Sequence, residues 1–222
     1  MSTTTINIDH YRLMAVLLDF PEQGLKEEVN EVQTFLESRY PDVVDNFRPF
    51  YELVKGISID DIQELYTRTF EVQAITTLDL GYLLFGDDYK RAELLVNLNR
   101  EHTTIGNDCG HELADHLPNV IRLITLLEDD ELRQELLRKL IIPGLKKMIG
   151  DYDPEKLKRK NEVYVKHHKT LIELKEYGGS IYQFPIITLL SMIETDFGLT
   201  AVEKEETPDF LSSLSTEMKI ED

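Results

Sequence analysis

Apolar residues recur along most of this chain with the spacing of amphipathic helices. Between Leu25 and Leu36, for example, they fall at every third or fourth position and so line one face of a helix. Proline and glycine residues separate one such segment from the next, and no convincing alternation of apolar and polar residues predicts a strand. We therefore predict an all-α fold, a single-domain bundle of about nine or ten helices.

Some local patterns make sharper predictions. Ser58–Asp61 has the form of a capping box in which Asp replaces the usual Glu or Gln. Asp153-Pro154-Glu155 predicts the start of a helix that we expect to reach Tyr177. Segment 76–85 is apolar on almost all sides, which predicts the buried central helix of the bundle, with a buried strand as the competing interpretation. Residues 103–114 have the glycines and polar side chains of a loop.

Prolines mark three further positions. Pro118 is tolerated because it lies in the first turn of a predicted helix, where no amide donor is needed. After a helix over 131–140, Pro143 is expected to open a short helix that ends at Gly150. Pro185 is expected to interrupt a last helix over 180–195.

The composition agrees with a helical protein that contains one cysteine, Cys109, in 222 residues. That count excludes an internal disulfide and a cysteine-based zinc site. The first residues lack the pattern of a signal peptide and no apolar run is long enough to span a membrane, so we expect cytoplasmic localisation without direct membrane insertion. We assign residues 1–200 to one helical domain and residues 201–222 to a flexible acidic tail. The sequence leaves open whether the protein is a monomer or a homodimer.

Charge is distributed unevenly along the chain. The net charge is −18, but residues 138–175 contain eleven Lys and Arg against five Asp and Glu, so the rest of the chain carries −24. This acidic majority makes nucleic acid a poor partner, because binding phosphates needs a basic footprint. The basic stretch is explained more simply by lysines on solvated helix faces than by an adaptor that binds nucleic acid. An acidic surface suits a basic peptide or protein instead.

The densest group of reactive side chains is His111-Glu112-Leu113-Ala114-Asp115-His116. A zinc protease motif needs histidines at i and i+4, whereas here the second lies at i+5, which turns the two imidazoles about 140° apart on a helix. A small metal-dependent hydrolase that uses His111, Glu112, Asp115 and His116 is therefore the alternative hypothesis. A purely structural interpretation makes Asp115 a helix cap that accepts a hydrogen bond from the amide of Leu117 or a neighbour. A third interpretation is a pocket for a peptide or a charged group.

Two ordered motifs lie in the middle of the chain. The first contains Tyr66-Thr-Arg-Thr-Phe70-Glu71 and the segment from Thr76-Thr77-Leu78 through Leu84-Phe85-Gly86-Asp87-Asp88, followed by Arg91 and Leu94-Leu95-Val96. The second is Glu112-Leu113-Ala114-Asp115-His116-Leu117-Pro118. Together they resemble the assembly chaperones of the nitrate reductase delta-subunit (NarJ) type and their TorD and DmsD relatives. The second motif is similar to that family's Glu-Leu-Pro-Asp-His-Leu-Pro signature, with Ala114 in place of the usual Pro.

The resemblance, which covers roughly residues 60–127, implies a cytoplasmic, all-helical chaperone that is not an enzyme and has no metal or cofactor of its own. Such chaperones bind the catalytic subunit of a molybdenum-containing oxidoreductase, often through its N-terminal leader or a remnant of it. They assist the insertion of molybdopterin guanine dinucleotide, which belongs to the client. The implied client-binding residues are Glu112, Asp115, His116, Leu117, Pro118, Tyr66 and Phe70. The sequence does not identify the client.

Overall fold

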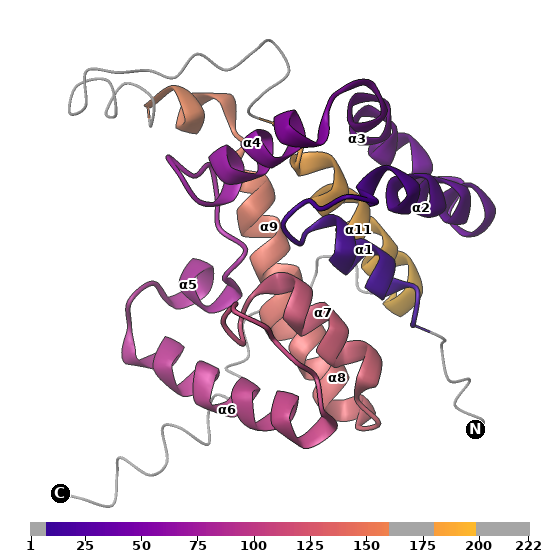
Figure 1. Cartoon of the computed structure of the whole chain (residues 1–222). Coiled ribbons are helices and arrows are strands. Elements are labelled where there is room, and N and C mark those ends of the chain that lie inside the picture. Colours follow the sequence, from indigo (N-terminus) through magenta and orange to yellow (C-terminus); the bar gives the residue numbers. More distant parts are fainter. Residues whose placement is uncertain (1–7, 160–179, 199–222) are drawn as a thin grey trace, which may run out of the picture.

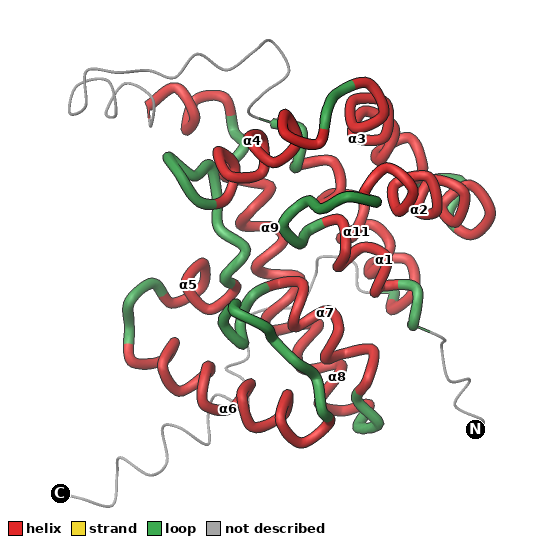
Figure 2. The backbone as a smooth tube through the Cα atoms, viewed as in Figure 1, coloured by secondary structure: helices red, strands yellow, loops and turns green. Residues whose placement is uncertain are grey.

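The computed structural model describes residues 8–159 and 180–198. These residues form helices with short connections and contain no strand, only an isolated antiparallel bridge between Asp79 and His116 (Figures 1 and 2). The all-α prediction is therefore confirmed. The elements are α1 (Tyr11–Leu17), α2 (Leu25–Arg39), α3 (Val44–Gly56), α4 (Ile59–Phe70), α5 (Leu80–Phe85), α6 (Tyr89–Ile105), α7 (Leu117–Leu126), α8 (Asp130–Leu136), the π-helix η1 (Leu137–Ile141), α9 (Ile142–Asp151) and α11 (Gln183–Phe197).

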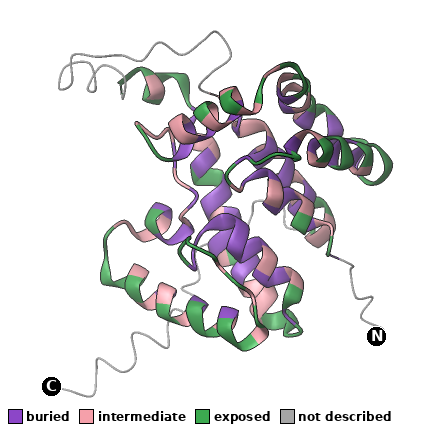
Figure 3. Ribbon diagram, in the orientation of Figure 1, coloured by how far each residue is buried: buried purple, intermediate pink, exposed green. Residues whose placement is uncertain are grey.

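Helix α7 runs through the middle of the described fold, and most of its residues are buried (Figure 3). Helix α1 packs along α7, and both α2 and α11 pack against α1. Helix α11 also contacts α3 and α9, so it joins the first helices of the chain to the later ones. Burial of these apolar faces is the main favourable contribution to folding, at roughly 25 cal/mol for each Å² of apolar surface removed from water.

A buried polar contact fastens α11 to the start of the chain. The hydroxyls of Tyr11 and Tyr40 donate to Asp196 Oδ2 over 2.9 and 2.7 Å, and His10 Nε2 lies 3.3 Å from the same oxygen. Burial alone would raise the pKa of Asp196, but the hydrogen bonds from His10, Tyr40 and Tyr11 outweigh it and hold that pKa below its usual range. The ionised carboxylate therefore links α1, α11 and the end of α2.

Segment 76–85 is not the central helix that its composition predicts. Only Leu80–Phe85 is helical, and α5 lies at the side of the fold, against α6, η1 and α9 (Figure 1). Leu80 is fully buried and packs closely on Gly144 of α9, whereas Tyr82 is 46% exposed. The segment therefore buries one face and leaves the other partly exposed. An apolar segment does not have to be buried on all sides.

Pro143 opens the short helix α9 as predicted, but no break separates that helix from the one before it, and Pro185 does not interrupt α11 as expected. The chain stays helical from α8 through η1 into α9, and the amide of Ile142 donates to the carbonyl of Leu137, five residues earlier. This wider turn accommodates Pro143, which lacks an amide donor and would crowd a regular helix. Pro185 lies in the first turn of α11, where its missing donor costs nothing, so it begins this helix without interrupting it.

The predicted helix starts at Ser58 and Asp153 are confirmed. Ser58 Oγ accepts from the amide of Asp61 over 3.2 Å, which is the first arm of a capping box, and the Ser58 hydroxyl donates to the Asp61 carboxylate over 2.7 Å. Asp153 Oδ1 accepts from the amides of Glu155 and Lys156, at 2.9 and 3.2 Å.

Several predictions lie wholly or partly outside the described residues. These are the acidic tail over 201–222, the continuation of the Asp153 helix to Tyr177, and the part of the basic stretch beyond residue 159. In the described part of that stretch, lysines form ion pairs with carboxylates: Lys139 with Glu135, Lys146 with Glu194 and Lys156 with Asp151. In residues 8–159 and 180–198, no helix combines the length and the apolarity needed to cross a membrane.

The position of α7 predicts the effect of truncating one of its side chains. Ile121→Ala removes a fully buried side chain and is expected to lower the free energy of unfolding by about 3 kcal/mol, because the surrounding helices cannot close the cavity. Urea denaturation measures this loss. The control Val96→Ala, at a position 66% exposed on α6, is expected to change it by less than about 0.5 kcal/mol. Equal losses in the two variants would contradict the central position of α7.

Candidate functional site

Two connections that are distant in sequence lie side by side in front of α7. One joins α4 to α5, and the other is the signature loop, defined here as residues 107–116 between α6 and α7 (Figure 2). The amide of Leu80 donates to the carbonyl of Asp115 over 3.0 Å, and the amide of Leu117 donates to that of Leu78 over 2.8 Å. These two bonds form the isolated bridge, and they bring the two family-like motifs together.

A polar cluster of Asp79, Arg91, Asp115 and His116 lies at this bridge. Arg91 Nε donates to Asp115 Oδ2 over 3.2 Å, and Arg91 Nη2 donates to Asp79 Oδ2 over 3.0 Å. The amide of Gly81 donates to the same Asp115 oxygen over 3.1 Å. The guanidinium also lies 5.2 Å from the ring centroid of Tyr82, within the range of a cation–π contact. The Asp115 side chain has no exposed surface, so Arg91 and Gly81 take the place of water around its charge.

The two carboxylates of the polar cluster differ in their pKa values. Burial raises the pKa of Asp115, and the nearby charge of Asp79 adds to the effect, although Arg91 opposes both. The pKa of Asp79 is lowered, chiefly because His116 donates a hydrogen bond to it and because Arg91 lies close. His116 Nδ1 lies 3.3 Å from Asp79 Oδ1, and since a carboxylate only accepts, this nitrogen carries the proton. Asp79 is therefore the firmly ionised member of the pair.

The structure corrects the capping role predicted for Asp115. The cap residue of α7 is His116, and the Asp115 carboxylate turns away from this helix toward Gly81 of α5. The amide of Leu117, which was expected to donate to Asp115, donates to Leu78 instead. Asp115, Leu117 and Pro118 are all buried, so these residues support the signature loop from inside and do not face solvent.

The remaining predicted site residues lie at different depths. Glu112 has a side chain that is 62% exposed, with Oε2 3.9 Å from His116 Nδ1. Tyr66 and Phe70 of α4 are buried beneath the surface, where their ring centroids lie 5.0 Å apart and both rings pack on Tyr182 of α11. Glu112 is thus the predicted residue that a partner can reach directly.

The field around Tyr66 shows that the two motifs face the same region. Burial raises the pKa of Tyr66, and the charges of Glu112, Glu71, Asp19 and Asp79 raise it further. These four acids come from three connections, those between α1 and α2, α4 and α5, and α6 and α7, and their charges act on the same tyrosine. We call them the acidic rim.

Three members of the acidic rim are each followed by an exposed apolar residue. Phe20 follows Asp19, Val72 follows Glu71 and Leu113 follows Glu112, with exposed fractions of 47, 52 and 47%. Phe20 also packs edge-on against Tyr66 at 5.5 Å. Asp19, Phe20 and Val72 were not among the site residues predicted from the sequence. An acidic residue followed by an apolar one, in a segment between two helices, is the pattern that could have pointed to them. The surface thus alternates negative charge with apolar contact area.

The catalytic interpretations of this region find no support in the geometry. Among the described residues, no group of three or more His, Cys, Asp and Glu side chains is arranged to hold a metal ion. His111 is exposed, and Cys109 is partly buried, with a pKa raised by that burial, so its thiol form is favoured over the nucleophilic thiolate.

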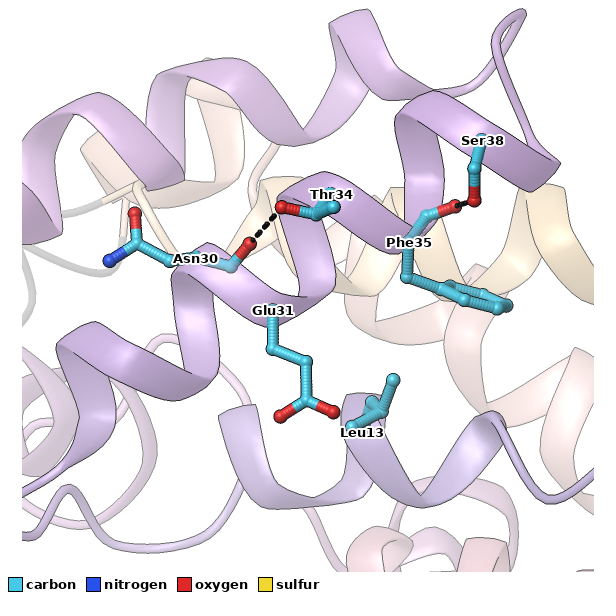
Figure 4. A pocket seen from close by; sticks show the side chains of 6 residues that line it. All are labelled: Leu13, Asn30, Glu31, Thr34, Phe35 and Ser38. Carbon is cyan, nitrogen blue, oxygen red and sulfur yellow. Dashed lines mark hydrogen bonds between the residues drawn. The ribbon is translucent and has the colours of Figure 1, made fainter.

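A separate groove of about 450 Å³ lies between α1 and α2, lined by Leu13, Asn30, Glu31, Thr34, Phe35 and Ser38 (Figure 4). Its hydroxyl groups are already bonded to their own helix: Thr34 Oγ1 donates to the carbonyl of Asn30 and Ser38 Oγ to that of Phe35, each over 2.9 Å. The groove therefore offers mainly the apolar surfaces of Leu13 and Phe35, with Glu31 as its ionisable group.

Comparison with known proteins adds no relative: no family model matches this chain, and a search of curated proteins finds no match.

The contact between Gly81 and Asp115 gives a prediction with a matched control. A Cβ atom at Gly81 would lie 2.6 Å from Asp115 Oδ2 and 3.0 Å from Leu94, so Gly81→Ala is expected to lower the free energy of unfolding by about 2 kcal/mol. Gly56→Ala meets nothing within 4 Å and is expected to change it by less than about 0.5 kcal/mol. Thermal and urea denaturation measure both, and a harmless Gly81→Ala would contradict this packing.

Arg91→Ala is expected to lower the free energy of unfolding by about 3 kcal/mol at neutral pH, because it leaves Asp115 buried and uncompensated. The loss relative to wild type should shrink as the pH falls toward the usual carboxyl range, because protonation removes the buried charge of a group whose folded-state pKa is raised. Denaturation series at several pH values measure the difference. A loss that is constant with pH would contradict the role assigned to Arg91.

Proposed function

We propose that this protein is a cytoplasmic chaperone that binds the catalytic subunit of a molybdenum-containing oxidoreductase through its N-terminal leader or a remnant of it. In this role it assists the insertion of the molybdenum cofactor and the assembly of the enzyme. The observation that carries the proposal is the convergence of the two family-like motifs: Asp79 and Arg91 from the first bond with Asp115 and His116 from the second. Residues 37 positions apart in the chain, such as Asp79 and His116, thus form one polar cluster.

The acidic rim supplies the chemistry for binding such a leader. The exposed carboxylates of Glu71 and Glu112 can pair with arginines of a basic segment, while Phe20, Val72 and Leu113 can take the apolar face of an amphipathic peptide. Asp19 and Asp79 contribute less, because they already pair with Arg122 and Arg91. The charge of −24 outside residues 138–175 would speed the encounter with a basic peptide, in a way that salt weakens. Asp115 takes part indirectly, because Arg91 already occupies its carboxylate.

A metal-dependent hydrolase is the alternative that sequence analysis left open, and no observation on the described residues favours it. Metal analysis of protein purified without a polyhistidine tag tests it directly. Zinc or iron bound at one equivalent would favour the hydrolase over the chaperone.

The chaperone proposal predicts which surface residues matter for binding. The probe is a synthetic peptide with the N-terminal sequence of a molybdoenzyme catalytic subunit from the same organism. Glu112→Gln is expected to weaken its binding about threefold, because an exposed ion pair contributes little, and Glu112→Gln with Leu113→Ser about tenfold. Isothermal titration calorimetry at low salt measures the dissociation constants.

The matched control is Glu52→Gln, which removes one exposed carboxylate from α3, away from the acidic rim. It is expected to leave binding unchanged. Equal weakening by Glu52→Gln would show that only the overall negative charge matters, and no detectable binding of the folded wild-type protein would refute the proposal.

A further inference from the structure

One buried histidine holds the signature loop in place. His102 of α6 is 2% exposed, and its Nε2 lies 3.0 Å from the carbonyl oxygen of Ala114. Its Nδ1 lies 2.8 Å from Asn107 Nδ2, at the other end of the loop. Both ring nitrogens are thus engaged by the loop, at the residue before Asp115 and at the residue where the loop begins.

The partners of this network determine where its protons lie. Asn107 Nδ2 also donates to the carbonyl of Asn119 over 3.1 Å, and a carbonyl only accepts, so the amide nitrogen of Asn107 faces both partners. His102 Nδ1 therefore accepts, which places the ring proton on Nε2, where it is donated to Ala114. The geometry accommodates one form of the ring, the neutral imidazole protonated on Nε2.

A second proton has no place in this arrangement. It would put an N–H group on Nδ1 directly opposite the amino group of Asn107, so that two donors face each other. If the Asn107 amide turned over to present its oxygen, the carbonyl of Asn119 on α7 would lose its donor. In either case, one contact among α6, the loop and α7 is lost.

The charged surroundings of His102 do not offset this conflict. Burial lowers its pKa, and the opposing effects of the Ala114 carbonyl and of Glu101, its neighbour on α6, are smaller. The ionisable loop groups nearest the network in sequence are Asp108 and Cys109. From α7, Arg122 places Nη1 3.5 Å from Asn119 Oδ1.

We infer that His102 is a proton-sensitive positioning residue: when neutral it fastens the signature loop to α6, and when it takes up a proton it releases that loop. Because the loop carries Asp115, His116 and Glu112, its release would disassemble the polar cluster and move one side of the acidic rim. Binding of a partner at that surface would then weaken in mildly acidic solution. This last consequence rests on the proposed function, whereas the opening of the loop does not.

The sign of the effect follows from linkage. The folded-state pKa is lowered, so His102 stabilises the closed loop above its ordinary pKa, and this contribution is lost as the pH falls below it. With an ordinary pKa of about 6.5, the equilibrium for loop opening should rise by up to about tenfold between about pH 7.5 and 5.5, the limit for a closed loop that takes up no second proton.

Amide hydrogen exchange measures loop opening without any client. After correction for intrinsic rates, exchange at His116 and Leu117 is expected to rise by up to about tenfold over this interval in the wild type, but to stay flat in His102→Gln, whose amide keeps one donor and one acceptor. His111→Gln removes an exposed histidine from the same loop and should behave like the wild type. Equal pH dependence in the wild type and His102→Gln would overturn the inference.

Should His102→Gln fail to fold, nuclear magnetic resonance of the wild-type histidines decides the question. Loop opening should follow the titration of His102, and opening that follows His10, His111 or His116 instead would overturn the inference.

Calorimetry with the client peptide at about pH 7.5 and 5.5, on the wild type and on His102→Gln, tests separately whether the loop regulates binding. If only the wild type binds more weakly at low pH, the result supports regulation by His102. If the wild type and His102→Gln show the same pH dependence, the result overturns it. An absence of binding at every pH would refute the proposed function but leave the exchange result standing.

Discussion

The carboxylate of Asp115 has no exposed surface, and a buried charge costs several kcal/mol unless its neighbours compensate it. The compensation here comes from separate elements, since Arg91 lies on α6 and the amide of Gly81 on α5. Both must reach the same oxygen, so this requirement fixes the relative positions of α5, α6 and the signature loop. The second oxygen, Oδ1, has no hydrogen-bond partner among the described residues, which agrees with the raised pKa of this group.

Different residues of the signature loop and the start of α7 therefore hold the structure together and face the solvent. Asp115, Leu117 and Pro118 lie inside and determine the path of the loop, while Glu112 and Leu113 lie outside and offer charge and apolar surface. Most residues of the second family-like motif, Glu112–Pro118, are therefore buried and serve the packing of the loop. Substitution of its buried members would change stability first and recognition only as a consequence.

The sequence predicted the all-α class and the helix starts at Ser58 and Asp153, because helical periodicity and capping depend on residues close together in the chain. It failed in segment 76–85 and did not predict the π-turn that precedes Pro143. The π-turn that accommodates Pro143 and the contact of Leu80 with Gly144 both depend on how α5, η1 and α9 pack, which local patterns do not contain.

The same limit applied to the candidate site. Glu112, Asp115 and His116 could be selected from one short segment, and Tyr66 and Phe70 from a resemblance. That Arg91 pairs with Asp115, or that the charge of Glu112 raises the pKa of Tyr66, depends on how the fold brings together residues 24 or more positions apart. The roles of the buried residues therefore became clear only with the fold.

Tyr182 lies beneath both Tyr66 and Phe70, yet it belongs to α11 and follows them in the chain by more than a hundred positions. During synthesis, the ribosome adds the signature loop well before it adds this tyrosine. A nascent chain that has completed α7 thus still lacks the ring on which Tyr66 rests and the Asp196 contact that fastens α11 to Tyr11. The packing around Tyr66 is therefore complete only after α11 has been translated, and the proposed binding surface above it would form only in finished copies of the protein.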